Sequence, residues 1–292
     1  MKVLVIGGGG FLGTKLQDIL RVHDYDVSST YNHTIPADMQ NSYPLDITVK
    51  KDVDTIIKKI APDVIIHAAA LTNVDECERN KGLADAINVE GTRNVALVAK
   101  KIDAKVVYVS TDYVFDGTKG LYKEQDAVCP VNHYGVTKLK GEEIVRTLVD
   151  EWLIVRPSVI YGAGTKKNFA MWILENLQRQ NRIRIVSDQF VSPTLNTDVS
   201  EQVVALLKHD VTGVFHTAGG ERVDRYSFSQ IVADVFGLDS SLIQGISMTE
   251  MTWVARRPVD SSLDVSMVTR FKKPYKLKEA VNLLKEEIER RL

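Results

Sequence analysis

Three residues of this sequence have the types and spacing needed for proton transfer beside a carbonyl group: Thr111, Tyr134 and Lys138. Tyr134 and Lys138 stand four positions apart, so they share one face of a helix. A tyrosine pKa is ordinarily about 10, and we expect the neighbouring cation to lower the pKa of Tyr134. Thr111 follows an apolar strand-like run, 106–109, and its hydroxyl can hydrogen-bond a carbonyl oxygen while Tyr134 delivers a proton. The set predicts chemistry at a carbonyl or an alcohol.

A glycine-rich loop supplies the second part of that chemistry. Gly7, Gly10 and Gly13 keep a three-residue period between a predicted strand, 3–6, and a predicted helix, 11–21. Glycine lets the backbone turn tightly, approach a pyrophosphate and pack the helix against the strand. The phosphate then lies at the helix N-terminus, where free amides favour an anion. The loop therefore predicts that a nicotinamide dinucleotide binds here. This cofactor would exchange a hydride with the carbonyl or alcohol group on which Thr111 and Tyr134 act.

The sequence gives a preference between the two forms of that cofactor. In NAD enzymes an acidic residue about twenty positions after the loop binds the adenosine 2′-hydroxyl. Here that stretch reads Ser-Ser-Thr-Tyr-Asn, and Asp24 and Asp26 come too early. Without the carboxylate a 2′-phosphate is not repelled, although no Arg or Lys nearby attracts it. We predict NADP(H), with the hydroxyls of Ser29 and Thr30 as contacts, and NAD(H) stays an alternative.

A second stretch on the same side of the cofactor is Asp46-Ile47. It precedes a predicted helix, 50–60, and is a candidate contact for the adenine. A helix cap at Asp46 or Thr48 explains the same residues equally well.

Strands and helices must alternate to position these residues. Short apolar runs separated by longer amphipathic stretches predict a parallel sheet covered on both faces. This is the doubly wound α/β fold (Rossmann), in which ligands bind at the carboxyl ends of the strands. The predicted strands are 3–6, 27–30, 64–66, 106–109 and 153–155, and the predicted helices are 11–21, 50–60, 83–101 and 134–149.

The alternation loosens after Arg156, where glycines and prolines separate shorter elements. We predict that residues 1–156 form the cofactor-binding domain and that 157–292 form mainly a smaller C-terminal substrate-binding lobe, with at least one crossing back to the sheet. The last stretch, 275–292, places Leu277, Ala280, Val281 and Leu284 on one face. We expect this helix to pack on its own domain rather than to bind a partner.

Composition excludes several classes of function. The net charge of −1 gives no electrostatic basis for binding nucleic acid or an anionic membrane. The two cysteines, Cys77 and Cys129, have neither disulfide nor metal-ligand spacing. No apolar run approaches the length of a membrane span, and the first strand begins too early to leave room for a signal peptide. We therefore expect a cytoplasmic protein that binds no membrane.

The order of motifs along the chain resembles the extended short-chain dehydrogenase/reductase family. After the glycine-rich turn come His67-Ala-Ala-Ala70, Asn88-Val-Glu-Gly-Thr92, Tyr134-Gly-x-Thr-Lys138 and Arg156-Pro-Ser-x-x-Tyr-Gly162. Within that family, Ser110-Thr-Asp-Tyr-Val-Phe-Asp-Gly117, Asp188-Gln-Phe-x-x-Pro-Thr194 and Arg257-Pro258 resemble the dTDP-4-dehydrorhamnose reductases. The similarity covers nearly the whole chain and is sparser after Thr194.

The resemblance implies roles for further residues. Asn88 would hold a water in the proton relay, or else serve as a polar residue in helix packing. Arg257 would bind the nucleotide diphosphate through its bidentate fork, or else form a surface ion pair. By motif position, the cofactor contacts would be Gly7, Gly10, Phe11, Leu12, Gly13, Ala68, Ala69, Ala70, Tyr134, Lys138 and Arg156. The contacts of a nucleotide-sugar substrate would be Val74, Thr111, Asp112, Tyr113, Asn168 and Arg257.

Two departures from the family pattern bear on function. Sugar-nucleotide dehydratases of this family carry a glutamate where this chain has Tyr113, so reduction is favoured over elimination of water. Some bacterial rhamnose reductases have a glutamate at the position of Lys15 that helps to bind magnesium between subunits. Because Lys15 is a cation, we expect no metal.

These features lead to one main hypothesis and two alternatives. The main hypothesis is an NAD(P)H-dependent reductase of a 4-keto-6-deoxy sugar nucleotide, in deoxysugar or dTDP-rhamnose synthesis. The first alternative is a non-catalytic, NADP-binding subunit that resembles the regulatory subunit of methionine adenosyltransferase. The second is a sugar-nucleotide epimerase. The helices predicted at 83–101 and 134–149 often form the dimer contact in this family, which makes a homodimer an expectation.

Overall fold

The computed structural model of this chain describes residues 1–35, 40–164 and 168–290. Its centre is a seven-stranded parallel sheet in the order β11-β6-β5-β4-β1-β2-β3. Its central strands are mainly apolar and are buried on both faces, as expected for a sheet covered on both sides. The strands are β1 (Lys2–Ile6), β2 (Asp26–Tyr31), β3 (Ser42–Pro44), β4 (Val64–His67), β5 (Lys105–Val109), β6 (Trp152–Arg156) and β11 (Gly213–His216).

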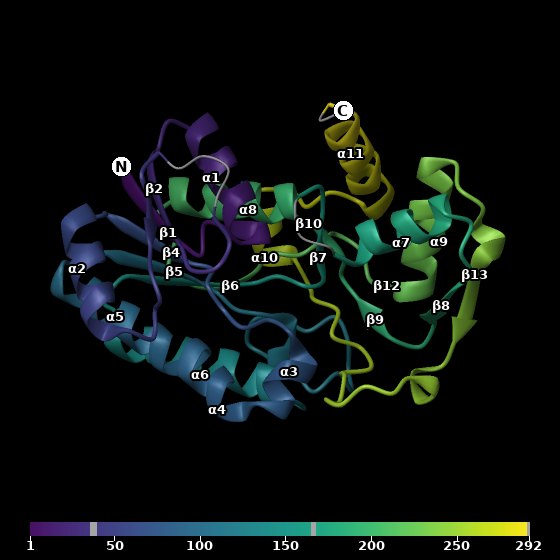
Figure 1. The fold of residues 1–292 in the computed structure, drawn as a ribbon, viewed down its shortest axis with the longest axis horizontal. Helices are drawn as coiled ribbons and strands as arrows, with labels where there is room; N and C mark the ends of the chain where they lie inside the picture. The colour runs from purple at the N-terminus through teal and green to yellow at the C-terminus, as the bar shows by residue number, and fades with distance from the viewer. Residues whose placement is uncertain (36–39, 165–167, 291–292) are drawn as a thin grey trace.

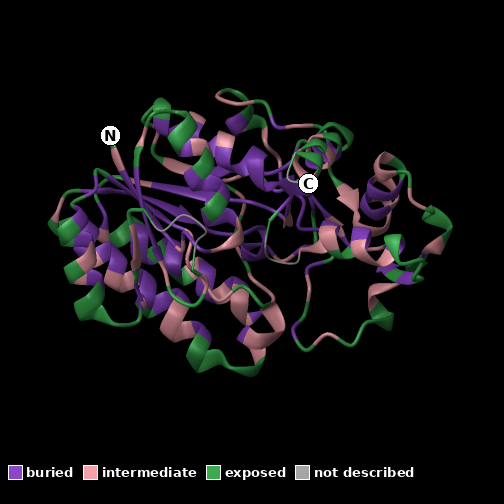
Figure 2. Cartoon of the chain, turned by 45° about the horizontal axis from the view of Figure 1, so that its top comes forward, coloured by how far each residue is buried: buried purple, intermediate pink, exposed green. Residues whose placement is uncertain are grey.

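Helices cover the two faces of the sheet, with α1 and α8 on one side and α2, α5 and α6 on the other (Figure 1). Each face has its own apolar core, and the strands between them are buried while the outer helix faces are exposed (Figure 2). The doubly wound fold predicted from the sequence is confirmed. These helices are α1 (Phe11–Val22), α2 (Lys50–Ile60), α5 (Thr92–Lys101), α6 (His133–Leu148), α8 (Asn196–Lys208) and the short α10 (Ser266–Thr269).

The second half of the chain builds a smaller lobe beside the sheet (Figure 1). Three two-stranded ladders pair β7 (Ile160–Tyr161) with β10 (Thr194–Leu195), β8 (Ile183–Val186) with β13 (Ile243–Ile246), and β9 (Phe190–Val191) with β12 (Val223–Asp224). A third apolar core joins them to α7 (Phe169–Gln178), α9 (Arg225–Phe236) and α11 (Leu277–Glu289). Leu277, Ala280, Val281 and Leu284 of α11 are buried in this core; residues 291–292 of the stretch predicted as helical lie outside the described residues.

The chain returns from this lobe to the sheet twice. α8 packs against α1 and leads into β11, which adds the seventh strand beside β6. A later segment, 251–263, runs from the short 3₁₀ turn η4 (Met248–Glu250) back across the carboxyl edge of the sheet, where Leu263 pairs with Tyr122. The second lobe is thus connected to the sheet at two places, through α8 with β11 and through the segment 251–263.

One predicted helix differs from the structure in a way that concerns the site. The stretch predicted as helix 83–101 is divided into α4 (Lys81–Asp85), the π-helical turn η1 (Ala86–Gly91) and α5. Asn88 lies in the π turn, fully buried, and its side chain bonds to the backbone of Leu71. Wider π turns of this kind frequently occur at functional sites. The short elements β3 and α3 (Val74–Arg79) were not predicted, because three and six residues are too few to show a period.

Candidate active site

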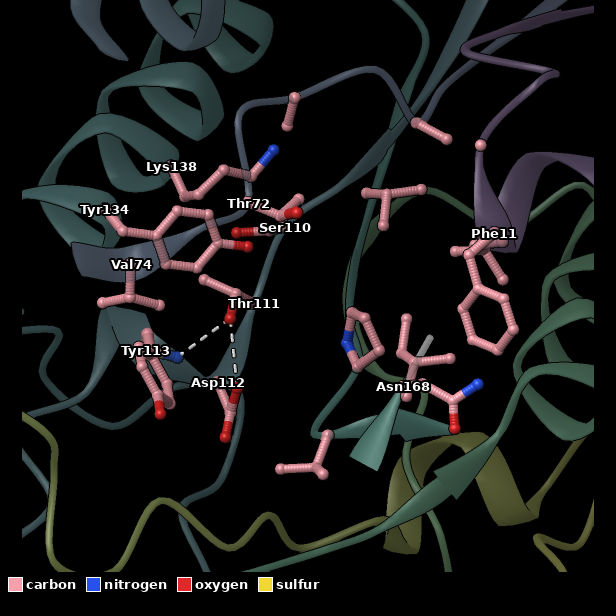
Figure 3. Close-up of a pocket in the computed structure, with 18 of the residues that line it drawn as sticks. Phe11, Thr72, Val74, Ser110, Thr111, Asp112, Tyr113, Tyr134, Lys138 and Asn168 are labelled. Atoms are coloured by element: carbon pink, nitrogen blue, oxygen red, sulfur yellow. Dashed lines mark hydrogen bonds between the residues drawn. The ribbon is translucent and has the colours of Figure 1, made fainter. Parts of the chain in front are cut away.

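A pocket of about 460 Å³ opens at the carboxyl ends of the central strands, a size typical of ligand sites. Tyr134 and Lys138 lie on one wall, and Phe11 and Asn168 lie across from them (Figure 3). Thirteen of the residues predicted from sequence line it: Gly10, Phe11, Leu12, Gly13, Ala68, Ala70, Val74, Thr111, Asp112, Tyr113, Tyr134, Lys138 and Asn168. Its remaining lining residues, which were not predicted, are Thr72, Val109, Ser110, Pro157, Val159, Ile160 and Arg225.

The glycine-rich turn forms one end of the pocket, and the structure requires glycine there. Gly7 has a φ of +88°, and a Cβ on it would lie 2.8 Å from the backbone nitrogen of Ala69. A Cβ on Gly13 would lie 2.2 Å from the carbonyl oxygen of Gly7. Gly10 is the N-cap of α1 and no side chain caps that helix, so its first amides point free toward an anion.

The catalytic candidates come from two neighbouring elements. Tyr134 and Lys138 are one turn apart at the start of α6, whose N-cap Asn132 accepts a hydrogen bond from the backbone N–H of Gly135. Thr111 follows β5 and both lines the pocket and caps the 3₁₀ turn η2 (Asp112–Val114). Thr111 therefore caps this turn and lines the pocket at the same time.

Burial decides the protonation state of Tyr134. Removal from water raises the pKa of Tyr134 well above its ordinary value, and the hydrogen bond with Thr111 opposes this rise. The net shift of the Tyr134 pKa is therefore upward, opposite to the lowering expected from the sequence, because the cost of burying the phenolate dominates. Tyr134 consequently carries its proton at neutral pH, which is the form a general acid requires.

Lys138 is buried to 2% exposure. Burial lowers the pKa of Lys138 to about 7, against a smaller opposite effect of Glu142. Its ammonium lies 4.1 Å from the centre of the Tyr108 ring, so an aromatic face replaces part of its hydration. The lysine is thus poised to gain a proton when oxygen acceptors arrive beside it.

We expect the affinity for NADPH to fall as pH rises above about 7. The cofactor favours the protonated amine of Lys138, and above that pH the unliganded protein loses the proton from this amine. Binding near pH 7 should then take up protons, which titration calorimetry in two buffers of different ionisation enthalpy measures. Lys138→Met should bind more weakly and lose this pH dependence. An unchanged dependence in Lys138→Met would assign it to another group.

Replacement of Thr111 by alanine should lower turnover by about tenfold and leave NADPH affinity unchanged, since one hydrogen bond to the developing oxyanion is lost. Steady-state kinetics with Thr111→Ala, and with Thr111→Ser as a control that keeps the hydroxyl, measure this. A Thr111→Ala enzyme as fast as the wild type would contradict the role.

Two residues assigned from the resemblance lie outside the pocket. Arg156 is 1% exposed, and its Nε and Nη2 donate to Glu142 at 2.8 and 2.7 Å. The structure therefore corrects its predicted role as a cofactor contact, because this guanidinium is used by a buried ion pair. Asn88 donates to Leu71 and Thr137 and accepts from the Leu71 amide. Its amide is occupied by the loop after β4 and by α6, which fits the packing alternative.

The residues predicted around the adenosine also lie outside the pocket lining. The hydroxyl of Ser29 is buried and 2.8 Å from that of Ser42, and the Thr30 carbonyl accepts from the amide of Gly8. Asp46 accepts from the backbone and hydroxyl of Thr48, but the N-cap of α2 is Val49 without a side-chain cap, so the helix cap considered at Asp46 or Thr48 is not formed. Ile47 is 5% exposed and belongs to the core. Ala69 contributes only the backbone that approaches Gly7.

A second pocket of about 340 Å³ adjoins the first, since Tyr113 and Arg225 line both. Arg257 lies here, with its Nη2 2.9 Å from Asp75 and its guanidinium 5.4 Å from the Trp253 ring. The ion pair considered for Arg257 is therefore present, and its place in the pocket wall leaves diphosphate binding as a prediction. Half of the remaining lining is aromatic or basic and most of the rest is aliphatic: Phe169, Trp172, Arg184, Trp253, Ile185, Val186, Met251 and Gln189.

Arg225 is the functional candidate that sequence reasoning missed. It begins α9, donates to Gln189 at 2.6 Å and lies over the Phe169 ring. Its position between the two pockets suits a diphosphate. No motif surrounds it in the sequence, and only the fold brings it beside Asp112 and Tyr113.

Comparison with known proteins decides the family. Residues 1–289 match the protein family described as RmlD substrate binding domain. This chain belongs to the RmlD family. It is 33% identical over 273 residues to the probable low-salt glycan biosynthesis reductase Agl14 of Haloferax volcanii, covering 92% of this chain and 91% of that one. It is 32% identical over 279 residues to the dTDP-4-dehydrorhamnose reductase of Escherichia coli K12, covering 90% and 89%.

A solved structure agrees with this assignment. The dTDP-4-dehydrorhamnose reductase of Bacillus anthracis, in complex with NADP, superposes on this RmlD family member with a TM-score of 0.89 at 30% identity, covering 98% of this chain and 99% of that one. The resemblance inferred from sequence is confirmed. In this chain Lys15, the position that raised the question of a metal, pairs with Glu287 of α11 at 3.2 Å. Among the residues described, no helix is both long and apolar enough to span a membrane.

Proposed function

We propose that this RmlD family protein is a reductase that transfers a hydride from NADPH to the keto group of a 4-keto-6-deoxy sugar nucleotide. The observation that carries the proposal is the convergence of Thr111, Tyr134 and Lys138 on a pocket whose other end is the glycine-rich turn. The reductase names of its relatives and the NADP bound to the B. anthracis structure support it.

The residues present fit a nicotinamide dinucleotide. The turn from Gly7 to Gly13 leaves space that any Cβ would fill, and the uncapped start of α1 suits a pyrophosphate. When bound, the cofactor supplies the hydride. We keep NADP(H) as the preferred form and NAD(H) as the alternative, because the described residues directly after β2, 32–35, include no carboxylate that would repel a 2′-phosphate.

The chain's own residues perform the acid–base part of the reaction. Tyr134, protonated at neutral pH, donates its proton to the substrate carbonyl oxygen. The Thr111 hydroxyl hydrogen-bonds the same oxygen as negative charge develops there. Lys138 holds the hydroxyls of the nicotinamide ribose and supports the phenolate left on Tyr134. The tyrosine at position 113 stands where dehydratases carry a glutamate, so the acid that those enzymes use for eliminating water is missing at this position.

The two adjoining pockets suit the two halves of the substrate. Val74, Asp112 and Tyr113 line the first pocket near the catalytic trio and are assigned to the sugar. Arg225, at the junction, and Arg257 are assigned to the diphosphate. The aromatic walls of the second pocket then accept the nucleoside. Asn168, which caps α7 and donates to the carbonyl of Gly162, shapes the wall between them.

Absorbance at 340 nm tests the proposal. dTDP-4-keto-6-deoxy sugar generated by a dehydratase is supplied with NADPH and, separately, with NADH. Oxidation that requires the sugar nucleotide supports the reductase and ranks the two cofactors. Tight NADPH binding without oxidation of the cofactor points to the regulatory-subunit alternative. Isomerised sugar without net oxidation points to the epimerase.

Two further parts of the account are proposals. We infer that the protein is cytoplasmic, in keeping with an activity that draws on cytoplasmic cofactors and sugar nucleotides. We also infer a homodimer formed through α5 and α6, which run side by side on one face of the sheet (Figure 1). Size-exclusion chromatography with light scattering tests the second inference directly.

A further inference from the structure

Asp112, at the wall of the first pocket, accepts hydrogen bonds from three hydroxyl groups. Thr111 donates to its Oδ1 at 3.0 Å, and Ser158 and Ser261 donate to its Oδ2 at 3.0 and 2.6 Å. All four side chains are buried. Ser261 comes from far along the chain, on the segment 251–263 that returns from the second lobe. A buried carboxylate is therefore fixed by donors from both halves of the protein.

This arrangement determines where the Thr111 hydroxyl points. A hydroxyl has one proton and two lone pairs. The backbone N–H of Tyr113 donates to the Thr111 oxygen, and the Thr111 proton is directed at Asp112 (Figure 3). The Asp112 carboxylate thus fixes the Thr111 side chain before substrate binds, and the single Thr111 proton turns from Asp112 to the substrate oxygen when that oxygen arrives. Anything that lets the carboxylate turn also lets Thr111 turn.

Ser261 is placed to prevent that rotation. It makes the shortest of the three bonds to Asp112, and its own backbone is held by the Phe190 carbonyl at 3.0 Å. Burial raises the pKa of Asp112, whereas the hydrogen bonds from Ser261, Ser158 and Thr111 lower it. The charged or titratable groups that interact with Asp112 are Arg225, Tyr113 and Tyr134. Of these only Arg225 is a cation, so the hydroxyl donors are needed to stabilise the buried carboxylate.

We propose that Ser261 is a positioning residue for the reduction, which acts through Asp112 to hold the Thr111 oxygen where its proton can turn to the substrate carbonyl. The inference rests on the reductase function proposed above. Ser261 touches neither substrate nor cofactor, because the first pocket is lined by Asp112 and Thr111 and not by Ser261. Its removal should therefore slow the chemical step and leave substrate affinity unchanged.

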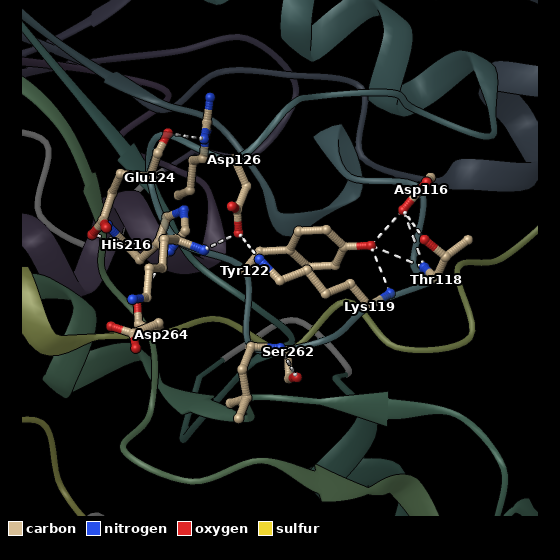
Figure 4. A network of polar contacts seen from close by, with 12 residues as sticks. Asp116, Thr118, Lys119, Tyr122, Glu124, Asp126, His216, Ser262 and Asp264 are labelled. Atoms are coloured by element: carbon tan, nitrogen blue, oxygen red, sulfur yellow. Dashed lines mark hydrogen bonds and ion pairs between the residues drawn. The ribbon is translucent and has the colours of Figure 1, made fainter.

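The next residue in the chain provides a matched control. Ser262 (Figure 4) is as fully buried as Ser261. Its hydroxyl donates to Asp260 at 2.6 Å and accepts from the backbone of Leu121. Ser261→Ala and Ser262→Ala each delete one buried, hydrogen-bonded hydroxyl from the same segment. Only Ser261→Ala removes a donor to Asp112.

We expect Ser261→Ala to lower kcat by about tenfold, as the loss of one hydrogen bond to a charged group would, with KM and NADPH Kd within about twofold of wild type. Ser262→Ala should lower the melting temperature to a similar extent and keep the wild-type kcat. Ser158→Ala, which removes the other donor to the same oxygen, should also lower kcat. In an Asp112→Asn background, Ser261→Ala should produce no further loss, because the two residues act in one chain of contacts.

Equal kcat values for Ser261→Ala and Ser262→Ala would overturn the inference, as would additive losses in the Asp112→Asn background. A loss confined to KM would also contradict it. If the wild-type protein does not oxidise NADPH with any keto-sugar nucleotide, the proposed function fails and the inference falls with it. An active wild-type enzyme with equal kcat values for Ser261→Ala and Ser262→Ala would instead refute only the inference about Ser261.

Discussion

Replacement of Tyr134 by phenylalanine is expected to lower turnover at least about a hundredfold, the contribution of a well-placed general acid. The substitution removes only the phenol oxygen and keeps the ring that packs edge-on against Tyr113. NADPH affinity should be retained, since the glycine-rich turn and Lys138 are unaltered. Stopped-flow single-turnover rates and a fluorescence titration of NADPH measure the two quantities separately.

Tyr113→Phe is the matched comparison for that experiment. It deletes a phenol from the same pocket, 6.1 Å away between ring centres, at a position assigned to sugar binding. Its effect should appear mainly in KM and stay below about tenfold, as for one neutral hydrogen bond. Near-native turnover in Tyr134→Phe, or equal losses in the two variants, would remove Tyr134 from the mechanism.

Arg156→Met is expected to cost about 3 kcal/mol of unfolding free energy, because the buried Glu142 loses its bidentate partner and keeps only the partly exposed Arg146 as a cation. Glu142 is fully buried and also accepts from Ser110 at 2.6 Å. Neither residue reaches the pocket wall, so the NADPH Kd of the folded protein should be unchanged. Urea denaturation and cofactor titration at low temperature measure the two effects.

The double variant Arg156→Met with Glu142→Leu is the control for this prediction. It removes both charges and should be more stable than Arg156→Met alone, since a buried ion pair is often no better than an apolar pair of similar size. A large loss of NADPH affinity with little loss of stability would instead restore Arg156 to the cofactor site, where the family resemblance had placed it.

The sequence predicted those features that depend on local pattern. The glycine period, the Tyr134–Lys138 spacing and the apolar runs each express a geometry set within a few residues, and the structure brings them to one edge of the sheet. The burial of Arg156 could not be predicted in this way, because its partner Glu142 belongs to another element. The raised pKa of Tyr134 depends equally on surroundings contributed by distant segments.

The residues that sequence reasoning missed also depend on contacts between segments that are distant in the sequence. Arg225 and Ser261 stand in stretches without a motif, and each meets Asp112 only because the chain returns from the second lobe. The division of the predicted helix 83–101 by a π turn likewise follows from a contact, that of Asn88 with the loop after β4. Periodicity indicates that a helix forms there but carries no information about such a turn.

Transfer of deuterium from NADPH labelled at the nicotinamide C4 position tests the central claim most directly. The wild-type protein is incubated with dTDP-4-keto-6-deoxy sugar and each C4 epimer of the labelled cofactor, and the product is examined by mass spectrometry and NMR. The account predicts one deuterium on sugar carbon 4 from one of the two epimers, and none with Tyr134→Phe over the same time. Unlabelled sugar with the cofactor still reduced would contradict it, whether the sugar is unchanged or epimerised.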